Sequence, residues 1–406
     1  MIVPSIDLSE GRAVQLRRGK EKILTSDRDP VELAVELNRY GEVAVIDLDA
    51  AMGTGDNLEL QRELCEAADV RAGGGIRSEE RARKLLASGA RTLILGTAVS
   101  EDFVRRLPRH RVQAALDHVG GEVVDRGWTG ETGEGILQRA EKARPYVGSY
   151  LCTFVADEGS MEGMDIPAAK KLRNELDLPL TVAGGIACTE EVVELSRAGI
   201  DVQVGMALYK GLLDPVEAVV DSLSFPESGL LPTIAQDGSG QVLMLAYSSR
   251  ESLLRALREG RGIYYSRSRD QLWVKGETSG NLQSLISCRA DCDRDTILFT
   301  LEQTGAACHT GSYSCFGSRR FTMPELFEVI RQRKRDMPEG SYVASLLADP
   351  EKLSAKIREE AAEVVSAEDH DHLVWELADL LFFMSVRAAG EDIEWKRIVS
   401  ELGGRR

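Results

Sequence analysis

Short apolar runs alternate with amphipathic stretches along the first half of the chain. Amphipathic segments such as 58–68 and 80–90 carry apolar residues at the helical period of about 3.6 residues. Between such segments lie eight β-rich runs, at residues 2–7, 43–49, 70–75, 92–96, 112–117, 150–155, 180–185 and 202–206. Strands that alternate with helices in this way predict a closed parallel (β/α)₈ TIM barrel, over residues 1–223.

An internal repeat supports the barrel. Residues 74–76 (GGI) recur as residues 184–186, and Asp7 recurs as Asp117, both at an offset of 110 residues. The predicted barrel therefore consists of two matching half-barrels.

The pattern changes twice after the barrel. The segment SFPESG at 224–229 breaks the alternation and is typical of a linker. Residues 229–318 carry short strands with glycine-rich turns, and residues 321–406 carry long stretches with a helical period. The chain is thus predicted to be multidomain: a TIM barrel, a small mostly-β metal-binding domain and an all-α bundle.

Composition and charge narrow the class of protein. Hydrophobic content of 43% and charged content of 29% are typical of a globular protein. Seven cysteines, an odd number, favour a reducing compartment over a disulfide framework. A net charge of −16 disfavours nucleic acid and acidic membrane as partners, but not phosphorylated metabolites. The sequence shows no apolar run typical of a signal peptide or of a membrane-spanning helix, so we expect a cytoplasmic protein.

Two aspartates are the candidate catalytic residues of the barrel. Catalytic groups on such barrels lie at the C-terminal ends of strands, and Asp7 and Asp117 end the first and fifth predicted strands. They would face each other across the mouth, where two carboxylates can take a proton on one side of a substrate and return it on the other. A single aspartate would be expected only to cap a turn, but the matched pair favours catalysis.

Glycine-rich turns recur in both half-barrels. Such turns leave backbone N–H groups free near helix starts, where they can bind phosphate. A single glycine-rich turn could simply allow the chain to bend tightly. Because the turn is duplicated, we instead predict two phosphate sites at opposite ends of an elongated substrate. The predicted phosphate-binding residues are Gly74, Gly75, Gly96, Thr97, Gly184, Gly185 and Gly205.

The barrel segment resembles a known family. The motifs MIVPSIDLSEGRAVQL, AGGGIRS, LGTAVS, ALDH followed by RGWTGETG, and VAGGI with VGMALYKG resemble the phosphoribosylformimino-aminoimidazole-carboxamide ribotide isomerase of histidine biosynthesis. The resemblance implies a metal-free Amadori rearrangement of an aminoaldose to an aminoketose, with Asp7 and Asp117 as the acid–base pair. It also implies that Trp128 stacks on the substrate and that Thr153 lines the site.

The run DCDRD at 291–295 places one thiol among carboxylates. In an extended chain, alternation would put the carboxylates on one face and the thiol on the other. Clustered carboxylates suit Mg²⁺, with Asp291, Asp293 and Asp295 as ligands. Thiolates suit Zn²⁺, with Cys292, Cys308 and Cys315 as ligands and a fourth position left for water. Buried thiols and a solvated acidic turn are the alternatives that spacing leaves open.

The middle segment also resembles a family. MLAYSSRESL, YYSRSRDQLWVKGETSGN, DCDRD and GAACHTGSYSC resemble phosphoribosyl-AMP cyclohydrolase. The resemblance implies hydrolysis of the adenine N1–C6 bond with Zn²⁺ and Mg²⁺, in a homodimer whose subunits share the zinc ligands. His309 is the candidate for proton transfer. The candidates for contact with substrate phosphates are Arg267, Arg269 and Lys275.

Two pairs of acids mark the helical tail. Glu360 and Glu363 are three residues apart, as are Glu376 and Asp379, so each pair shares one helix face. Two facing pairs would form a carboxylate cage for Mg²⁺ with a nucleotide triphosphate. An ordinary solvated acidic face is the alternative, which the apolar residues around the acids disfavour.

The tail resembles phosphoribosyl-ATP pyrophosphohydrolase in RQRKRDMPEGSYVASLL, KLSAKIREEAAEVV and ELADLL. The resemblance implies Mg²⁺-assisted attack of water between the α and β phosphates, with release of pyrophosphate. It places Lys352, Lys356 and Glu359 near the triphosphate.

Together these resemblances predict a trifunctional histidine-biosynthesis enzyme that acts on phosphoribosyl nucleotides, with the tail first, the middle second and the barrel third. Glu158 and Met206 depart from the pattern of the barrel family. Two alternatives therefore stay open: an inactive barrel beside two hydrolases, or a barrel that isomerises phosphoribosylanthranilate. A non-catalytic nucleotide sensor is disfavoured by the intact acid and thiol groups.

Overall fold

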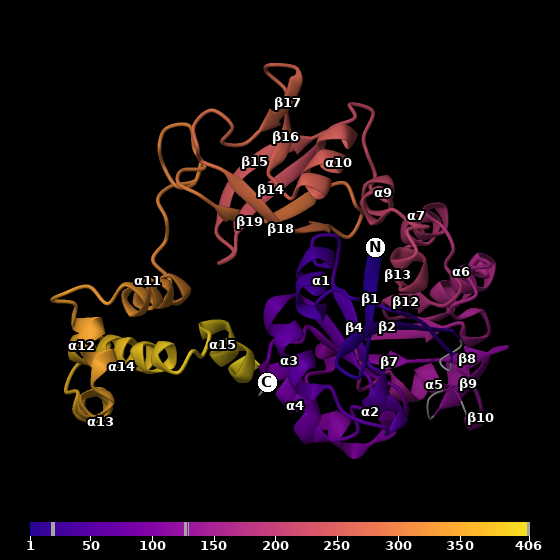
Figure 1. Ribbon diagram of the computed structural model, residues 1–406, viewed down its shortest axis with the longest axis horizontal. Helices are drawn as coiled ribbons and strands as arrows, with labels where there is room; N and C mark the ends of the chain where they lie inside the picture. Colours follow the sequence, from indigo (N-terminus) through magenta and orange to yellow (C-terminus); the bar gives the residue numbers. More distant parts are fainter. Residues whose placement is uncertain (18–20, 126–127, 129, 404–406) are drawn as a thin grey trace. The chain divides into compact units, whose positions relative to one another are not determined.

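The computed structural model describes residues 1–17, 21–125, 128 and 130–403 (Figure 1). The chain divides into two compact units, residues 1–319 and residues 320–403. The first unit contains both the barrel and the β domain, and the second is helical. In the described residues, no helix is both long and apolar enough to span a membrane.

The first unit begins with a closed parallel barrel, as the sequence predicts. Hydrogen bonds between the last barrel strand and the first close it, with Ile2 beside Val202. A small cluster of buried side chains fills its interior, including Val3 and Ile94, whereas the alternating Ile6 and Leu93 belong to the larger core. In the described residues its strands are β1 (Ile2–Ser9), β4 (Val43–Asp47), β5 (Val70–Gly73), β6 (Thr92–Leu95), β7 (Val112–Ala115), β11 (Ser149–Thr153), β12 (Leu180–Ala183) and β13 (Ile200–Val204).

Helices follow the barrel strands and carry the signals expected of helix starts. The Ser78 side chain accepts a hydrogen bond from the Arg81 backbone N–H at the start of α4 (Glu79–Ala87), and Asp165 caps α6 (Ile166–Glu175) in the same way. The other α-helices are α1 (Pro30–Leu37), α2 (Leu48–Met52), α3 (Leu58–Ala67), α5 (Ile136–Ala143), α7 (Thr189–Arg197), α8 (Met206–Tyr209) and α9 (Pro215–Asp221). Short 3₁₀ helices are η1 (Thr97–Ser100), η2 (Asp102–Arg106), η3 (Arg109–Arg111) and η4 (Val155–Asp157).

Antiparallel hairpins follow the two strands that lead to Asp7 and Asp117. Strands β2 (Arg12–Arg17) and β3 (Glu21–Thr25) extend from β1. A separate sheet of β8 (His118–Val119), β9 (Glu122–Asp125) and β10 (Gly130–Gly135) follows β7. The sequence did not predict these hairpins, although their matching positions obey the same half-barrel repeat.

The β domain, described in full, is one mixed sheet with a single long helix. Its strand order is β17-β16-β15-β14-β19-β18, and only β14 and β19 pair in parallel. The bounds are β14 (Leu231–Asp237), β15 (Val242–Ser248), β16 (Ile263–Ser266), β17 (Gln271–Val274), β18 (Gln283–Ala290) and β19 (Ile297–Gln303). The sequence did not predict the amphipathic helix α10 (Arg250–Glu259), which buries Leu253 and Leu257.

The barrel and the β domain share polar contacts and one hydrophobic core. Arg289 of β18 forms an ion pair with Asp69 at 3.1 Å and donates to the Asn38 backbone carbonyl. In the opposite direction, Arg39 of the barrel donates to the Leu257 carbonyl at 3.0 Å. These reciprocal bonds hold the edge strand β18 and the helix α10 against the barrel.

The second unit is helical, as the tail pattern predicts. Its core includes Phe327, Leu346, Leu353 and Phe383. The helices are α11 (Met323–Asp336), α12 (Tyr342–Ala348), α13 (Pro350–Ser366), α14 (His370–Gly390) and α15 (Trp395–Gly403). Residues 404–406 of the predicted tail domain lie outside the described residues.

Candidate active sites

The predicted barrel residues line one cavity of about 660 Å³ at the C-terminal ends of the strands. The structure thus gathers residues that are far apart in sequence and come from both half-barrels. They are Asp7, Gly74, Gly75, Gly96, Thr97, Asp117, Trp128, Thr153, Gly184, Gly185 and Gly205. Arg126, Gly127 and Thr129 of the RGWTG motif lie outside the described residues.

The two aspartates occupy different environments within this cavity. Asp7 accepts a hydrogen bond from the Ser5 hydroxyl at 3.3 Å, and burial raises its pKa to about 7. Asp117 accepts a hydrogen bond from the Trp128 indole N–H at 2.8 Å. Trp128 has a positive φ of 67°, a backbone conformation that is uncommon for a bulky residue. Asp7 can therefore exchange a proton near neutral pH, while Trp128 orients Asp117.

A third carboxyl group lies in the same cavity. Glu158 follows η4 and lines the cavity with Asp7 and Asp117. Burial, and then the negative charges of these two aspartates, raise the pKa of Glu158 to about 8. The sequence marked Glu158 only as a departure from a family pattern, because nothing in the sequence shows that it lies half-buried beside two other acids. Met206, the second departure, also lines the cavity.

The glycine turns bring backbone close to backbone. A Cβ added to Gly74 would lie 2.2 Å from the Asp47 carbonyl oxygen, and one added to Gly184 would lie 2.4 Å from that of Phe154. Both glycines have positive φ, at 88° and 98°. Only glycine fits at these two positions, and the resulting turns expose main-chain groups to the cavity.

Two glutamines that the sequence analysis missed also line the cavity. The amide nitrogen of Gln15 and the amide oxygen of Gln203 are buried without a hydrogen-bond partner in the described part of the chain. Buried amide groups are normally hydrogen-bonded, so these two atoms are available to a polar ligand.

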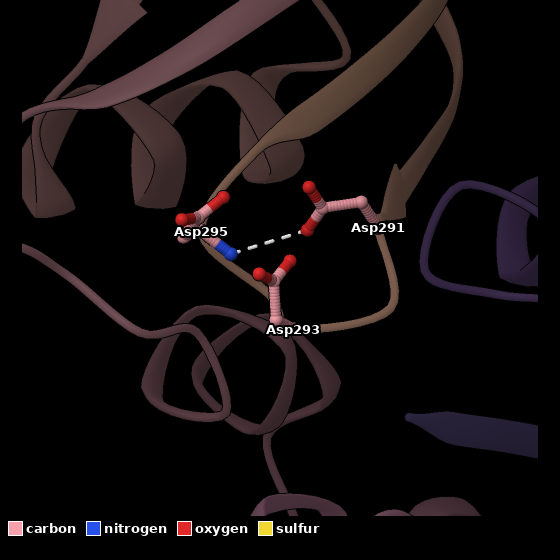
Figure 2. Close-up of side chains that lie close together, drawn as sticks. All are labelled: Asp291, Asp293 and Asp295. Atoms are coloured by element: carbon pink, nitrogen blue, oxygen red, sulfur yellow. Dashed lines mark hydrogen bonds between the residues drawn. The ribbon is translucent and has the colours of Figure 1, made fainter.

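In the β domain, the run 291–295 forms a bend between β18 and β19, so the prediction of an extended segment was wrong. The carboxylates converge nonetheless: oxygens of Asp291, Asp293 and Asp295 lie within 4.8 Å of one another (Figure 2). Asp291 accepts a hydrogen bond from the Asp295 backbone N–H at 3.1 Å, which closes the bend. These exposed hard oxygen ligands fit Mg²⁺ in chemistry and spacing.

The three cysteines predicted to bind zinc do not meet within the described chain. Cys308 and Cys315 interact with each other, and the Thr310 hydroxyl donates to the Cys308 sulfur at 3.1 Å. That hydrogen bond lowers the pKa of Cys308 and favours the thiolate. Cys292 lies in the bend and forms no metal-binding group with these two in the described residues. Two thiols suit part of a zinc site, which needs further ligands.

Lys275 lies beside this thiol pair. It is buried, and its ammonium group is 3.5 Å from the Ala306 carbonyl. Burial lowers its pKa, whereas the nearby Cys315 and Cys308 raise it. The sequence predicted Lys275 as a phosphate contact, but it did not show that the residue faces the thiols.

The other predicted residues of the β domain are more exposed. The Arg267 guanidinium lies 3.7 Å from the centre of the Tyr247 ring, and that of Arg269 lies 5.7 Å from the Trp273 ring. His309 is exposed, with its Nδ1 atom 3.9 Å from the Cys308 sulfur.

In the helical unit, acids from α13 and α14 converge. Oxygens of Glu360, Glu363 and Glu376 lie within 4.8 Å of one another, and Glu360 and Glu376 are buried. Asp379 is outside this group, but its charge, after the larger effect of burial, helps to raise the pKa of Glu360. Carboxylates this close together repel one another, and their hard oxygen ligands fit Mg²⁺.

Basic residues flank this acid cluster. Lys356 pairs with Glu359 at 2.9 Å and with Glu360 at 3.5 Å, while the Lys352 ammonium lies 5.6 Å from the Tyr342 ring. His372 contacts Glu376 at 3.0 Å, a neighbour that the sequence analysis did not single out. The spacing of four residues on one helix could have revealed it.

Three protein families match successive parts of the chain. A histidine biosynthesis protein family matches residues 1–214, phosphoribosyl-AMP cyclohydrolase matches 244–317, and phosphoribosyl-ATP pyrophosphohydrolase matches 323–406. The first match covers more than half of the chain. The chain belongs to the histidine biosynthesis protein family.

Relatives of this histidine biosynthesis chain include fused proteins. The histidine biosynthesis bifunctional protein HisIE of Parasynechococcus marenigrum is 43% identical over 47% of this chain and 95% of the relative. HisIE of Bacillus subtilis is 47% identical over 41% of this chain and 86% of the relative. The histidine biosynthesis trifunctional protein of Saccharomyces cerevisiae is 41% identical over 43% of this chain, but only 22% of the relative.

The histidine biosynthesis chain is an enzyme, with domains of the cyclohydrolase and pyrophosphohydrolase families beside an isomerase barrel. Its family domains occur in the order predicted from the sequence. The structure gives each domain a distinct group of titratable side chains.

Proposed function

We propose that the chain catalyses three consecutive steps of histidine biosynthesis. Phosphoribosyl-ATP loses pyrophosphate in the tail, the resulting phosphoribosyl-AMP is opened by water in the β domain, and the aminoaldose is rearranged to the aminoketose in the barrel. The observation that carries this proposal is that each family domain contains a cluster of side chains suited to its own step.

In the barrel, the rearrangement needs a proton for the ring oxygen of the sugar and a base for the proton on C2. Asp7, with a pKa of about 7, populates both its acid and its base forms near neutral pH. Asp117, oriented by Trp128, supplies the second group. The glycine turns and the amides of Gln15 and Gln203 hold the two phosphate ends and the polar groups between them.

In the β domain, Cys308 and Cys315 would hold Zn²⁺ and the acids of the bend would hold Mg²⁺. Bound zinc lowers the pKa of a water molecule to about 7 and so supplies hydroxide at neutral pH. We propose that Cys292 of the partner subunit completes the zinc site of a homodimer. His309 lies close to Cys308, so its imidazole could transfer protons to or from a substrate bound beside the zinc site. Lys275 would offset the negative charge of the Cys308 and Cys315 thiolates.

In the tail, Glu360, Glu363 and Glu376 would hold Mg²⁺, and Lys352 and Lys356 would contact the triphosphate. Bound magnesium neutralises charge on the phosphate oxygens. Burial of Glu360 and Glu376 keeps these two carboxyl groups fixed on adjacent helices, where they can orient the attacking water.

The proposal is tested by removing one side chain from each cluster and assaying all three substrates separately. Asp7→Asn, Cys308→Ser and Glu360→Gln should each reduce one step by about 10²–10⁴-fold and leave the other two intact. If Asp7→Asn left the isomerisation unchanged, the barrel would have no catalytic part in this pathway. Phosphoribosylanthranilate, assayed beside the aminoaldose, tests the alternative substrate.

A further inference from the structure

A second cavity, of about 710 Å³, lies where the barrel meets the β domain. It is lined from the barrel side by Arg197, at the end of α7, and by Asp221, at the end of α9. From the β domain, Arg250 of α10 and the bend residues Cys292, Asp293 and Arg294 line it. Ligand pockets commonly have volumes of about 300–1,000 Å³. The cavity is thus large enough for a nucleotide and opens beside the acidic bend.

The arginines of this cavity differ in their partners. Arg250 forms two hydrogen bonds with the Asp221 carboxylate, at 2.9 and 3.0 Å. Arg197 donates to the Asp221 backbone carbonyl at 2.8 Å and forms no ion pair with any described residue. Arg294 makes no ion pair within the part of the chain that the structure describes. Among the described residues, the cavity therefore holds two guanidinium groups that form no ion pair, although the charge of Asp201 acts on Arg294 from a distance.

The backbone fixes Arg294 in this place. Its φ of 65° is uncommon for a residue other than glycine, and such backbone strain is found mainly at functional sites. The Arg294 carbonyl accepts a hydrogen bond from the Ser224 backbone N–H at 2.8 Å. The linker after the barrel thus holds the bend, and with it Arg294, against the cavity.

We propose that this cavity binds a phosphate monoester of the nucleotide acted on by the β domain, with Arg294 and the barrel residue Arg197 as its anion ligands. Guanidinium groups bind phosphate through paired N–H donors. The acidic bend adjoins the same cavity, so a cation held there and the two arginines would contact one substrate. The candidate active site of the barrel lies at the other ends of the barrel strands. The barrel would then contribute a positioning residue to the neighbouring hydrolase. This inference rests on the proposed cyclohydrolase function.

Steady-state kinetics with phosphoribosyl-AMP and calorimetric titration with AMP test the inference in the full-length chain. For Arg197→Gln and Arg294→Gln we expect about a tenfold rise in KM and in the Kd for AMP, with kcat within about twofold of the original. Arg197→Lys should restore part of the affinity. Arg255→Gln is the matched control, because Arg255 lies on α10, outside the cavity lining, and pairs with the exposed Glu259 at 2.8 Å.

Unchanged KM and unchanged AMP affinity in both glutamine variants would overturn the inference. A fall in kcat with unchanged KM and unchanged Kd for AMP would also overturn the inference. The arginines would then support the folded structure and would not bind the phosphate. A chain that binds AMP in an Arg197- and Arg294-dependent way, yet fails to hydrolyse phosphoribosyl-AMP, would support the anion site and reject the cyclohydrolase function. Because Arg197 is exposed, its variant separates binding from folding.

Discussion

At the scale of single residues, burial determines which acids hold protons. Asp7 and Glu158 sit in one cavity, and their pKa values rise to about 7 and about 8 because desolvation disfavours the charged form. Glu360 follows the same rule in the tail, where burial raises its pKa. The sequence identified Asp7 and Glu360 by their position in a repeat or a helix, but the proton affinity of each depends on its surroundings.

The pH dependence of the isomerase step tests this account of the barrel. We expect kcat/KM to rise as Asp7 ionises near pH 7 and to fall as Glu158 ionises near pH 8, because a third negative charge would then face Asp7 and Asp117. Glu158→Gln should abolish the fall above pH 8 and keep the rise near pH 7. If kcat/KM of the Glu158→Gln variant still fell above pH 8, another group would be responsible for that fall.

The same shifts predict how stability depends on pH. Both carboxyl groups have folded-state pKa values above their ordinary values of 3.8 and 4.5. The folded barrel therefore binds these protons more tightly than the unfolded chain, and that stabilisation is complete below about pH 4. This stabilisation is lost as the pH rises through about 7, where Asp7 ionises, and about 8, where Glu158 ionises. We expect Glu158→Gln to flatten this decline in the unfolding temperature, and an equally steep decline would contradict the assignment.

At the scale of elements, tight turns place the phosphate-binding backbone. Gly184 has a positive φ of 98° and lies close to the Phe154 backbone, whereas Gly211 has a φ of 67° and no atom near the position of a Cβ. These two glycines separate the effect of backbone conformation from the effect of close approach.

Alanine at the two positions should therefore have unequal effects. Gly211→Ala carries only the conformational strain, about 1 kcal/mol in the free energy of unfolding. Gly184→Ala adds a clash with a carbonyl oxygen, and we expect a loss of at least about 3 kcal/mol together with weaker substrate binding in the barrel. Calorimetric unfolding of the two variants measures the difference. Equal losses would show that the turn relaxes around a side chain.

The acid cluster between α13 and α14 leads to a second prediction at the scale of elements. Glu360→Gln removes a charge from the acid cluster, so we expect pyrophosphate release to need at least about tenfold more Mg²⁺ and to be much slower at saturation. Glu339→Gln, in an exposed turn outside the cluster, is the control. An unchanged Mg²⁺ dependence in Glu360→Gln would place the metal elsewhere.

At the scale of the whole molecule, the sequence predicted what depends on local pattern. The eight barrel strands, the glycine turns and the tail helices follow from periodicity and repeats. The bend at 291–295 was predicted as extended because a short polar run gives no periodic signal, and Asp291 closes it through hydrogen bonds that only the structure shows. Glu158, Gln15 and Arg197 were not predicted as participants, because their roles depend on distant segments that fold around them.

The separation of Cys292 from Cys308 and Cys315 makes a prediction about assembly. If two subunits share each zinc site, Cys292→Ser and Cys308→Ser chains should both be inactive in ring opening but should complement each other when refolded together. Half of the randomly formed dimers would be mixed, each with one intact site, so about a quarter of the original activity should return. No recovery would mean that each site forms within one chain.

The full conversion of phosphoribosyl-ATP by the purified chain, with Mg²⁺ and Zn²⁺, tests the central claim most directly. We predict that pyrophosphate, the ring-opened aminoaldose and the aminoketose appear in that order, with the aminoketose as the final product. Accumulation of the aminoaldose with no aminoketose would contradict the claim of three activities, and so would a failure to release pyrophosphate.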